Sequence, residues 1–408
     1  MWSLHLADTM TGLLGEPIDI PHFSWALSLT DSSLVTGDKM AGVDELTSLQ
    51  LPWTSVPAAT PQARSAALQS YKRAIVLLWD GVPLMYGIIG ARTDTYDGTS
   101  FSALSIFSLL KSRILTDDAN FGKGTIWAKD ADYSHEGDQE GTVTSVTRGD
   151  KTFTGSLRSI CCQIGRELTD LKPAGQLPID WQYLNEAGKH TRTYHNFNVQ
   201  NNDGQKLLKA ISEVTNGIDM RWVPYMADKS HVRLRFEAGT DSEPYIGQRG
   251  IPFGFHSFRG GGNLSDIKVA HQGATMRVYG TGAGHEEAML CHKSEDLRLC
   301  STQDPLPLIE MAKSNSDWET PALVASHTDA VLDTVKYPLV QISGVYHLRD
   351  KYAPQIGELY PGDVVDVTIE DFPSLPSRIY RLRVAEMRGD SSDAVEILFD
   401  PIKDPIYS

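Results

Sequence analysis

Short runs of alternating apolar and polar residues, separated by turn signals, occur near both ends of this chain of 408 residues. In "GELYPGDVVDVTIED", residues 357–371, Pro361 fixes φ and Gly362 allows a bend before a run rich in β-branched side chains. The following segment, 377–401, alternates in the same way and turns back at "RGDSSDA". The carboxyl end is therefore predicted to be a small β-module of antiparallel strands.

A second β-module is predicted near the amino end. The segment "PHFSWALSLTDSSL" alternates like a half-buried strand and stops at an Asp-Ser-Ser corner. In "RAIVLLWDGVPLMYGIIG" two apolar runs are split by Asp80 and Gly81, a strong hairpin signal, and a third strand is expected after Asp97 and Gly98. We expect a loop over residues 51–70, which are rich in Pro, Ala and Ser.

The apolar period changes in the middle of the chain. After about residue 118 the sequence becomes polar and Gly-rich, which indicates a domain boundary. In "GSLRSICCQIGREL" the apolar residues follow the spacing of a helix that Ser156 caps, with Cys161 in its buried stripe. A second helix is predicted in "DGQKLLKAISEVTNG" with Asp203 as its N-cap, followed by strands in "IDMRWVP" and "HVRLRFEAG".

Strands and glycine turns return after residue 240, and the segment "SNSDWETPALVASHTDAVLDTVKYP" then interrupts them with a predicted helix. We therefore expect a mainly β protein in which two antiparallel β-modules flank an α+β middle domain. The predicted domains are 1–118, 119–240 and 241–408, with a helical insertion at about 305–336 in the third.

Composition restricts the class of function. The chain has 52 acidic and 37 basic residues, a formal net charge of -15, which opposes a nucleic-acid-binding surface. We expect no membrane span and no export signal, because no apolar run is long enough and the start lacks a basic region. The four cysteines lack a Cys-x-x-Cys spacing and are expected to be reduced, structural thiols.

Motifs of nucleotide and metal chemistry are incomplete. In "YGTGAGHEE" a dinucleotide-binding loop would need glycine where His285 stands, so the segment is better explained as a β-turn. A metal could in principle be held by His285, His292, Cys291 and Cys300, but the run from Glu286 to Leu290 is expected to be a strand. We predict no structural metal there.

An acidic segment, "DADYSHEGD", resembles the start of a calcium loop. Its oxygen-bearing side chains, at every second position, are Asp130, Asp132, Ser134 and Glu136. The glycine that such a loop needs at its sixth position is His135, so we expect a solvated acidic loop. The sequence "RGGGN" at 259–263 is expected to be a flexible junction.

No nucleophile motif occurs in the sequence, and we predict no catalytic, cofactor-binding or metal-binding residue. The only dense polar and aromatic cluster is "GKHTRTYHNFNVQ", which contains His190, Tyr194, His195 and Phe197. It is expected to be an exposed strand of the middle domain, and a binding edge is the alternative.

The order of these segments resembles a known family. "FSWALSLTDSSL", then "LLWDGVPLMYGIIG", then a helical middle, then "LYPGDVVDVTIEDFP", "SRIYRLRVAEM" and "VEILFDP" is similar to the minor tail proteins of long-tailed (siphovirus) actinobacterial phages. Within these, the chain resembles the baseplate hub, or tail-associated, family. The late block matches that family's "L-x-PGD-x-V" turn and its closing strand.

The resemblance implies a homotrimer at the tail tip of a virion, assembled in the host cytoplasm. Each subunit would contribute two tube-like β-barrels, so that three chains form a pseudo-sixfold ring that adapts the sixfold tail tube to a threefold tip. The implied partners are the distal tail protein, the tape-measure protein and other tail-tip proteins. Genomic DNA would pass through the lumen without specific binding, and negative charge on the lumen would keep it from adhering.

The resemblance also implies that the protein is not an enzyme. Some family members carry peptidase, lysozyme or carbohydrate-binding domains, whereas this chain ends soon after "VEILFDP", so we expect none of these. Interfaces are expected on the outer faces of the barrel strands and in loops around Trp53 and Trp127.

Three alternatives remain open. A distal tail protein would form a sixfold ring with one barrel per chain. A cell-wall hydrolase could use His285 and Glu286 or the Asp130 cluster. A receptor-binding protein could use the edge at Tyr194 and His195.

Overall fold

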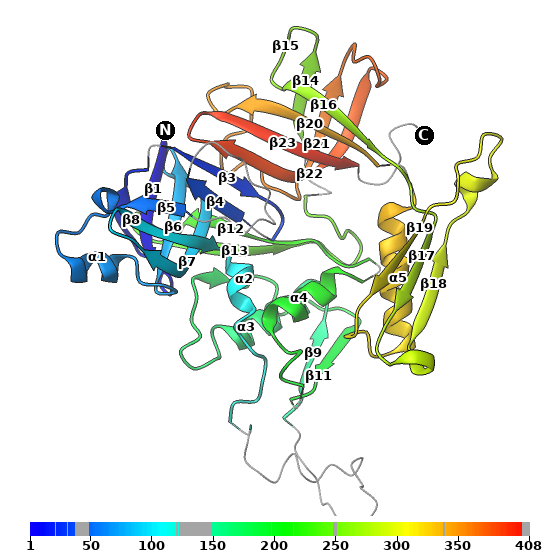
Figure 1. The fold of residues 1–408 in the computed structure, drawn as a ribbon, viewed down its shortest axis with the longest axis horizontal. Helices are drawn as coiled ribbons and strands as arrows, with labels where there is room; N and C mark the ends of the chain where they lie inside the picture. Colours follow the sequence, from blue (N-terminus) through cyan, green and yellow to red (C-terminus); the bar gives the residue numbers. More distant parts are fainter. Residues whose placement is uncertain are drawn as a thin grey trace, which may run out of the picture.

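The computed structural model describes residues 1–20, 22–30, 32–36, 49–119, 121, 149–196, 198–214, 216–247, 251–337 and 339–401. The described part of the chain is mainly β, as predicted, with few and mostly short helices (Figure 1). Figure 1 places the first strands on the left, the last strands at the top, and a separate group of yellow strands with α5 on the right.

The amino-terminal part forms an antiparallel sheet of six strands. In spatial order its strands are β2 (Leu14–Ile18), β1 (Trp2–Asp8), β6 (Arg73–Trp79), β7 (Val82–Asp94), β8 (Gly98–Leu104) and β5 (Leu49–Pro52). The predicted hairpin is confirmed, since Asp80 and Gly81 join β6 to β7 with φ of 48° and 82°. Positive φ at both central residues is what a tight two-residue hairpin needs.

The loop expected over residues 51–70 is a wrong prediction. This stretch contains the end of β5, the short helix η1 (Trp53–Ser55) and the helix α1 (Pro61–Ala67). The Thr60 hydroxyl accepts a hydrogen bond from the Ala63 amide, and Pro61 stands at the first helical position. This cap and proline are a complete helix-start signal, which the proline and serine content of the segment obscured.

The middle part combines helices with small sheets. Its elements are α2 (Ile106–Leu110), β9 (Lys151–Gly155), α3 (Leu157–Leu168), β10 (Ile179–Asp180), β11 (His190–Tyr194), α4 (Gly204–Ser212), β12 (Met220–Met226) and β13 (Val232–Ala238). Both predicted helix caps are confirmed, because Ser156 and Asp203 accept backbone hydrogen bonds at the starts of α3 and α4. Cys161 lies fully buried in α3 as predicted, and burial raises the pKa of its thiol well above the ordinary value.

The carboxyl-terminal part builds a nine-stranded sheet. Along its main path lie β15 (Gly261–Gly262), β14 (Phe253–Phe258), β21 (Val364–Ile369), β22 (Arg378–Asp390), β23 (Ala394–Pro401), β20 (Leu339–His347) and β16 (Ser265–Gln272). The strand predicted after the Pro361–Gly362 corner is confirmed as β21, and β21, β22 and β23 pair in antiparallel order. One pair, β14 with β21, is parallel, so the sheet is mixed and differs from the antiparallel module that was predicted.

Two strands from the amino-terminal region complete this sheet. They are β3 (Phe23–Leu27) and β4 (Ser32–Thr36). Strand β3 pairs with the last part of β22, where Leu27 stands opposite Met387. The nine-stranded sheet therefore contains residues from both ends of the chain, and the division into domains at 118 and 240 stays a prediction.

The nine-stranded sheet curls around an aromatic cluster. The Phe255 ring of β14 lies 5.6 Å from the Tyr346 ring of β20 and 5.8 Å from the Phe399 ring of β23. Strands β15 and β16, at the two ends of the sheet, are consecutive in the chain. Within the described ranges no strand pairing closes this sheet, or the six-stranded one, into a barrel.

The chain between β16 and β20 forms an insertion with a sheet of its own. This sheet has the order β18 (Cys291–Glu295), β17 (Arg277–Thr281) and β19 (Glu310–Ser314), and helix α5 (Pro321–Val335) contacts β17 and β18. Helix α5 lies within the insertion that was predicted at about 305–336. Strands β17 and β18 lie before residue 305, so the insertion starts earlier than predicted. The strand expected from Glu286 to Leu290 is wrong, because η2 (Glu286–Ala288) stands there and η3 (Arg298–Ser301) follows β18.

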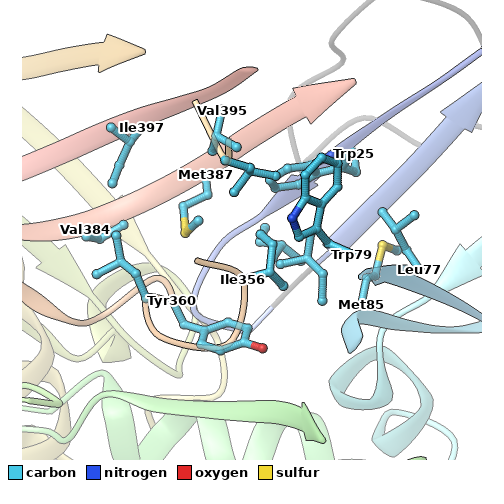
Figure 2. Close-up of a cluster of buried hydrophobic side chains, with 14 of the residues drawn as sticks. Trp25, Leu77, Trp79, Met85, Ile356, Tyr360, Val384, Met387, Val395 and Ile397 are labelled. Carbon is cyan, nitrogen blue, oxygen red and sulfur yellow. The ribbon is translucent and has the colours of Figure 1, made fainter. Parts of the chain in front are cut away.

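The two large sheets share one hydrophobic core. Trp2, Trp25 and Trp79 form its aromatic centre, with the Trp2 ring 5.7 Å from Trp25 and 4.9 Å from Trp79. Figure 2 shows Trp25 and Trp79 next to each other, with Met387 of the nine-stranded sheet nearby. Burying a large apolar side chain contributes about 1.5–3 kcal/mol, so this core holds the sheets together.

Candidate functional site

The turn Tyr360–Asp363 lies where the sheets meet. The Tyr360 hydroxyl donates a hydrogen bond to the Pro83 carbonyl oxygen of β7, 3.1 Å away, and Figure 2 shows this ring at the edge of the shared core. The turn is closed by its own residues, because the Asp363 carboxylate accepts from the Tyr360 amide at 2.8 Å. Gly362 has a φ of 96°, a conformation that glycine adopts without strain. The "LYPGD" sequence thus forms a hydrogen-bonded corner between sheets.

Arg221 of β12 binds this corner from the middle part of the chain. Its Nη1 donates to the Pro361 carbonyl oxygen at 2.9 Å, and its Nη2 lies 2.9 Å from Asp363 Oδ1. The same guanidinium lies 2.8 Å from Glu237 Oε2 of β13, and Arg221 is only 8% exposed. One buried cation therefore links a middle strand pair to the turn that starts β21.

Glu237 is held in its charged form within this cluster. Arg235 Nε donates to Glu237 Oε1 at 2.7 Å, on the side opposite Arg221. Burial disfavours the charged carboxylate, but Arg221 and Arg235 outweigh burial and lower the pKa of Glu237 below its ordinary value. The cluster is therefore a network of paired charges at neutral pH.

A second ion pair joins the same two parts of the molecule. Arg383 Nη1 of β22 donates to Asp219 Oδ2 at 2.7 Å, and its guanidinium carbon lies 4.9 Å from the centre of the Tyr245 ring. Burial raises the pKa of Asp219 even though Arg383 opposes this effect. Breaking a buried pair of this kind is destabilising, since it leaves an uncompensated charge. We call the Arg221 and Arg383 clusters the ionic junction.

The cations of the ionic junction are paired within the chain, with carboxylates and carbonyl oxygens as their partners. Arg221, Glu237 and Asp363 also line an open pocket of about 490 Å³. The junction therefore links the middle strands to the nine-stranded sheet beside this pocket.

The histidine, glutamate and cysteine candidates of the insertion are not brought together. His285 and Glu286 are exposed at η2, while His292 lies 3.3 Å from Asp329 of α5. Cys291 is exposed and Cys300 half-buried, and both are free thiols. In the described ranges no three His, Cys, Asp or Glu side chains gather in a way that could hold a metal.

The cluster at Tyr194 and His195 is a paired strand end. Tyr194 lies on β11, which pairs with β9, and its ring is 6.1 Å from the Phe153 ring. His195 Nδ1 lies 2.8 Å from Asp150 Oδ2. The expected strand is therefore present, and Tyr194 and His195 both contact β9 or the residue before it.

Trp53 and Trp127 were both expected in loops that form interfaces, and the structure describes only Trp53. Trp53 is half-buried against the core and donates from its indole to the Thr95 carbonyl oxygen at 2.9 Å, so it does not form an exposed loop. Trp127, Phe197 and the acidic cluster Asp130, Asp132, Ser134 and Glu136 lie outside the described residues.

Sequence reasoning missed the ionic junction. Charged residues alternate in "IDMRWVP" and "HVRLRFEAG", and this alternation predicted strands without a role for Arg221 or Glu237. In the structure Arg221 contacts the "LYPGD" corner and pairs with Glu237, because the nine-stranded sheet approaches this side of the strands.

None of the known protein families matches the chain, and no curated protein is similar to it in sequence. Solved structures do match. The 43 kDa tail protein of prophage MuSo2 from Shewanella oneidensis aligns over 99% of this chain and 98% of its own, with a TM-score of 0.50 and 9% identity. The two chains share a fold.

Two further tail proteins align over similar lengths with lower scores. The tail protein from Neisseria meningitidis MC58 covers 98% of this chain and 96% of its own, with a TM-score of 0.45 and 9% identity. Prophage tail protein gp18 from Listeria monocytogenes covers 99% and 96%, with a TM-score of 0.42 and 12% identity.

Among the described helices, none combines the length and the apolar character needed to cross a bilayer.

Proposed function

We propose that the protein is a structural subunit of a phage-type tail and acts as a trimeric hub at the tail tip. The observation that carries the proposal is the end-to-end fold likeness to the MuSo2 tail protein, which includes both large sheets and the part between them. The order of sequence motifs described above supports the same assignment independently of the structure. The host and the actinobacterial, long-tailed type of phage belong to this proposal.

In the proposed hub, each curled sheet acts as one tube-like barrel segment. The first unit spans 1–118, the middle unit 119–240 and the third 241–408. Strands β3 and β4 belong to the first unit by sequence but pair within the sheet of the third unit. Three chains then supply six barrel segments around a channel for DNA. The distal tail protein, the tape-measure protein and other tip proteins are the proposed neighbours.

The ionic junction suits this role. A ring that joins a sixfold tube to a threefold tip needs its two barrel segments held at one fixed angle. Arg221 and Arg383 tie the middle strands to the nine-stranded sheet, and Tyr360 ties that sheet to β7 of the first one. Buried, fully paired charges favour one orientation of packed parts over others.

Location in the particle tests the proposal. Gold-labelled antibodies raised against the purified protein are added to intact virions and to tails with disrupted tips. We expect labelling only at the tip end of the tail. Labelling along the tube or on the capsid would contradict the proposal.

The proposed hub works through interfaces and breaks no bonds. Purified protein incubated with host peptidoglycan is expected to release no soluble fragments. Release that disappears in Glu286→Ala would contradict this and favour a hydrolase.

A further inference from the structure

A cavity of about 520 Å³ lies between the middle part of the chain and the insertion. It is bordered by β11, the start of α3, the segment after α4 and the first turns of α5. Its lining is partly apolar and partly polar and includes Leu157, Val214, Leu323, His190, Arg192 and Asn216. Polar and charged residues outnumber apolar ones in this lining, so a ligand that fits it carries polar groups together with a smaller apolar part.

Arg192 is the exceptional member of this lining. Its side chain is half-buried, yet no ion pair or hydrogen bond joins its guanidinium to any residue that the structure describes. Two other arginines of the middle part, Arg158 and Arg233, each bind a carboxylate of this chain, whereas Arg166 is exposed on α3. A guanidinium carries five N–H donors and stays charged, so those of Arg192 are available to a ligand in the cavity.

The acidic side chain of the cavity, Asp241, already has two partners in the same lining. Asp241 Oδ1 accepts a hydrogen bond from the Leu157 amide at 2.9 Å, and its Oδ2 lies 3.4 Å from His190 Nε2. Asp241 therefore does not neutralise Arg192, although its negative charge still lies in the same cavity. Its presence favours a ligand with one negative charge over a doubly charged phosphate.

We propose that this cavity binds a single carboxylate carried on a short, partly apolar peptide segment, with Arg192 as its partner. The guanidinium can form two parallel N–H···O bonds with a carboxylate. Leu157, Val214 and Leu323 supply apolar surface for the residues that flank the carboxylate. The proposal is independent of the role in a phage tail, because it rests only on this cavity and its lining.

Saturation-transfer NMR on the full-length protein tests the proposal. The probes are acetyl-Leu-Glu-amide and acetyl-Leu-Gln-amide, which differ only in the side-chain carboxylate. We expect the Glu peptide to bind about tenfold more tightly than the Gln peptide, as a charge-assisted pair does relative to a neutral one. Arg192→Ala and Arg192→Gln should both abolish this preference, and Arg192→Lys should keep part of it.

Arg166→Ala is the matched control, because Arg166 lies on the exposed side of α3 and does not line the cavity. It should keep the full preference for the Glu peptide. The proposal is overturned if the Glu peptide gives no transfer at millimolar concentration, or if both peptides bind equally. It is also overturned if Arg192→Gln keeps the preference, or if inorganic phosphate displaces the Glu peptide at an equal concentration.

Discussion

Arg221 Nη2 lies 2.9 Å from Asp363 Oδ1, which joins strand β12 to the turn that precedes β21. The two residues are far apart in the chain, and Arg221 is almost completely buried. This ion pair links the middle strands to the nine-stranded sheet, so its loss should affect both.

Arg221→Ala should destabilise the protein by about 3–5 kcal/mol, because Asp363 would lose the buried cation that pairs with it and Glu237 would keep only Arg235. Urea unfolding followed by tryptophan fluorescence measures the loss. Arg235→Ala is the comparison, since Arg235 also contacts Glu237 but its side chain is 39% exposed. Arg235→Ala should lower the free energy of unfolding by less than about 1 kcal/mol. Equal losses would show that burial of Arg221 does not matter.

Tyr360→Phe should destabilise the protein by about 1–3 kcal/mol, because it leaves the Pro83 carbonyl oxygen buried without its hydrogen bond. The change removes a single oxygen and keeps the ring in the core. Tyr352→Phe is the control, because Tyr352 is 69% exposed, and it should leave the unfolding midpoint unchanged. An unchanged midpoint for Tyr360→Phe would mean that this contact does not hold the sheets together.

Gly362→Ala should cost about 1–3 kcal/mol, because Gly362 has a φ of 96° and an added Cβ would lie 2.6 Å from Leu29 Cδ2. Thermal unfolding monitored by circular dichroism measures the effect. In Gly254→Ala an added Cβ meets no atom within 4 Å, so this variant should unfold at the wild-type temperature or slightly above it. A stable Gly362→Ala protein would contradict the described turn.

Glu237 should make stability depend on pH in the acid range. Its pKa lies below the ordinary value of 4.5, because Arg221 and Arg235 outweigh burial. The folded protein therefore binds fewer protons than the unfolded chain at this residue, so its contribution is complete above about pH 4.5 and is lost as pH falls through the lowered pKa.

Glu237→Gln should consequently be less stable than the wild type at pH 7, and the difference should shrink as the pH falls through the lowered pKa of Glu237. The comparison uses the urea concentration at which half of each protein is unfolded, measured for both proteins at a series of pH values from 7 to 3. Glu16→Gln changes an exposed position of β2, and its urea midpoint should depend on pH in the same way as that of the wild type. A constant difference between Glu237→Gln and wild type at every pH would contradict the ion-pair explanation.

Local patterns in the sequence predicted many of the elements. The alternating run after Pro361 and Gly362, the turn at Asp80 and Gly81, and the capped helix after Ser156 are each determined by residues close in sequence. Such features depend on the backbone preferences of the residues and on which face is apolar. Both properties are determined by a short stretch of sequence.

The arrangement of those elements could not be predicted in the same way. The pairing of β3 with β22 brings Leu27 opposite Met387, and the parallel pairing of β14 with β21 depends equally on distant residues. Alternation shows that a strand has a buried face, but it does not show which strand lies beside it. For the same reason the pairing of Arg221 could not be predicted, because the turn that contacts it comes from another part of the chain.

The copy number of this polypeptide in the purified virion tests the central claim most directly. Quantitative mass spectrometry with isotope-labelled peptides gives the number of chains relative to the major tail protein. A trimeric hub predicts three copies per particle. Six copies would contradict the hub and indicate a distal tail ring, and absence from the particle would contradict a structural role in the tail.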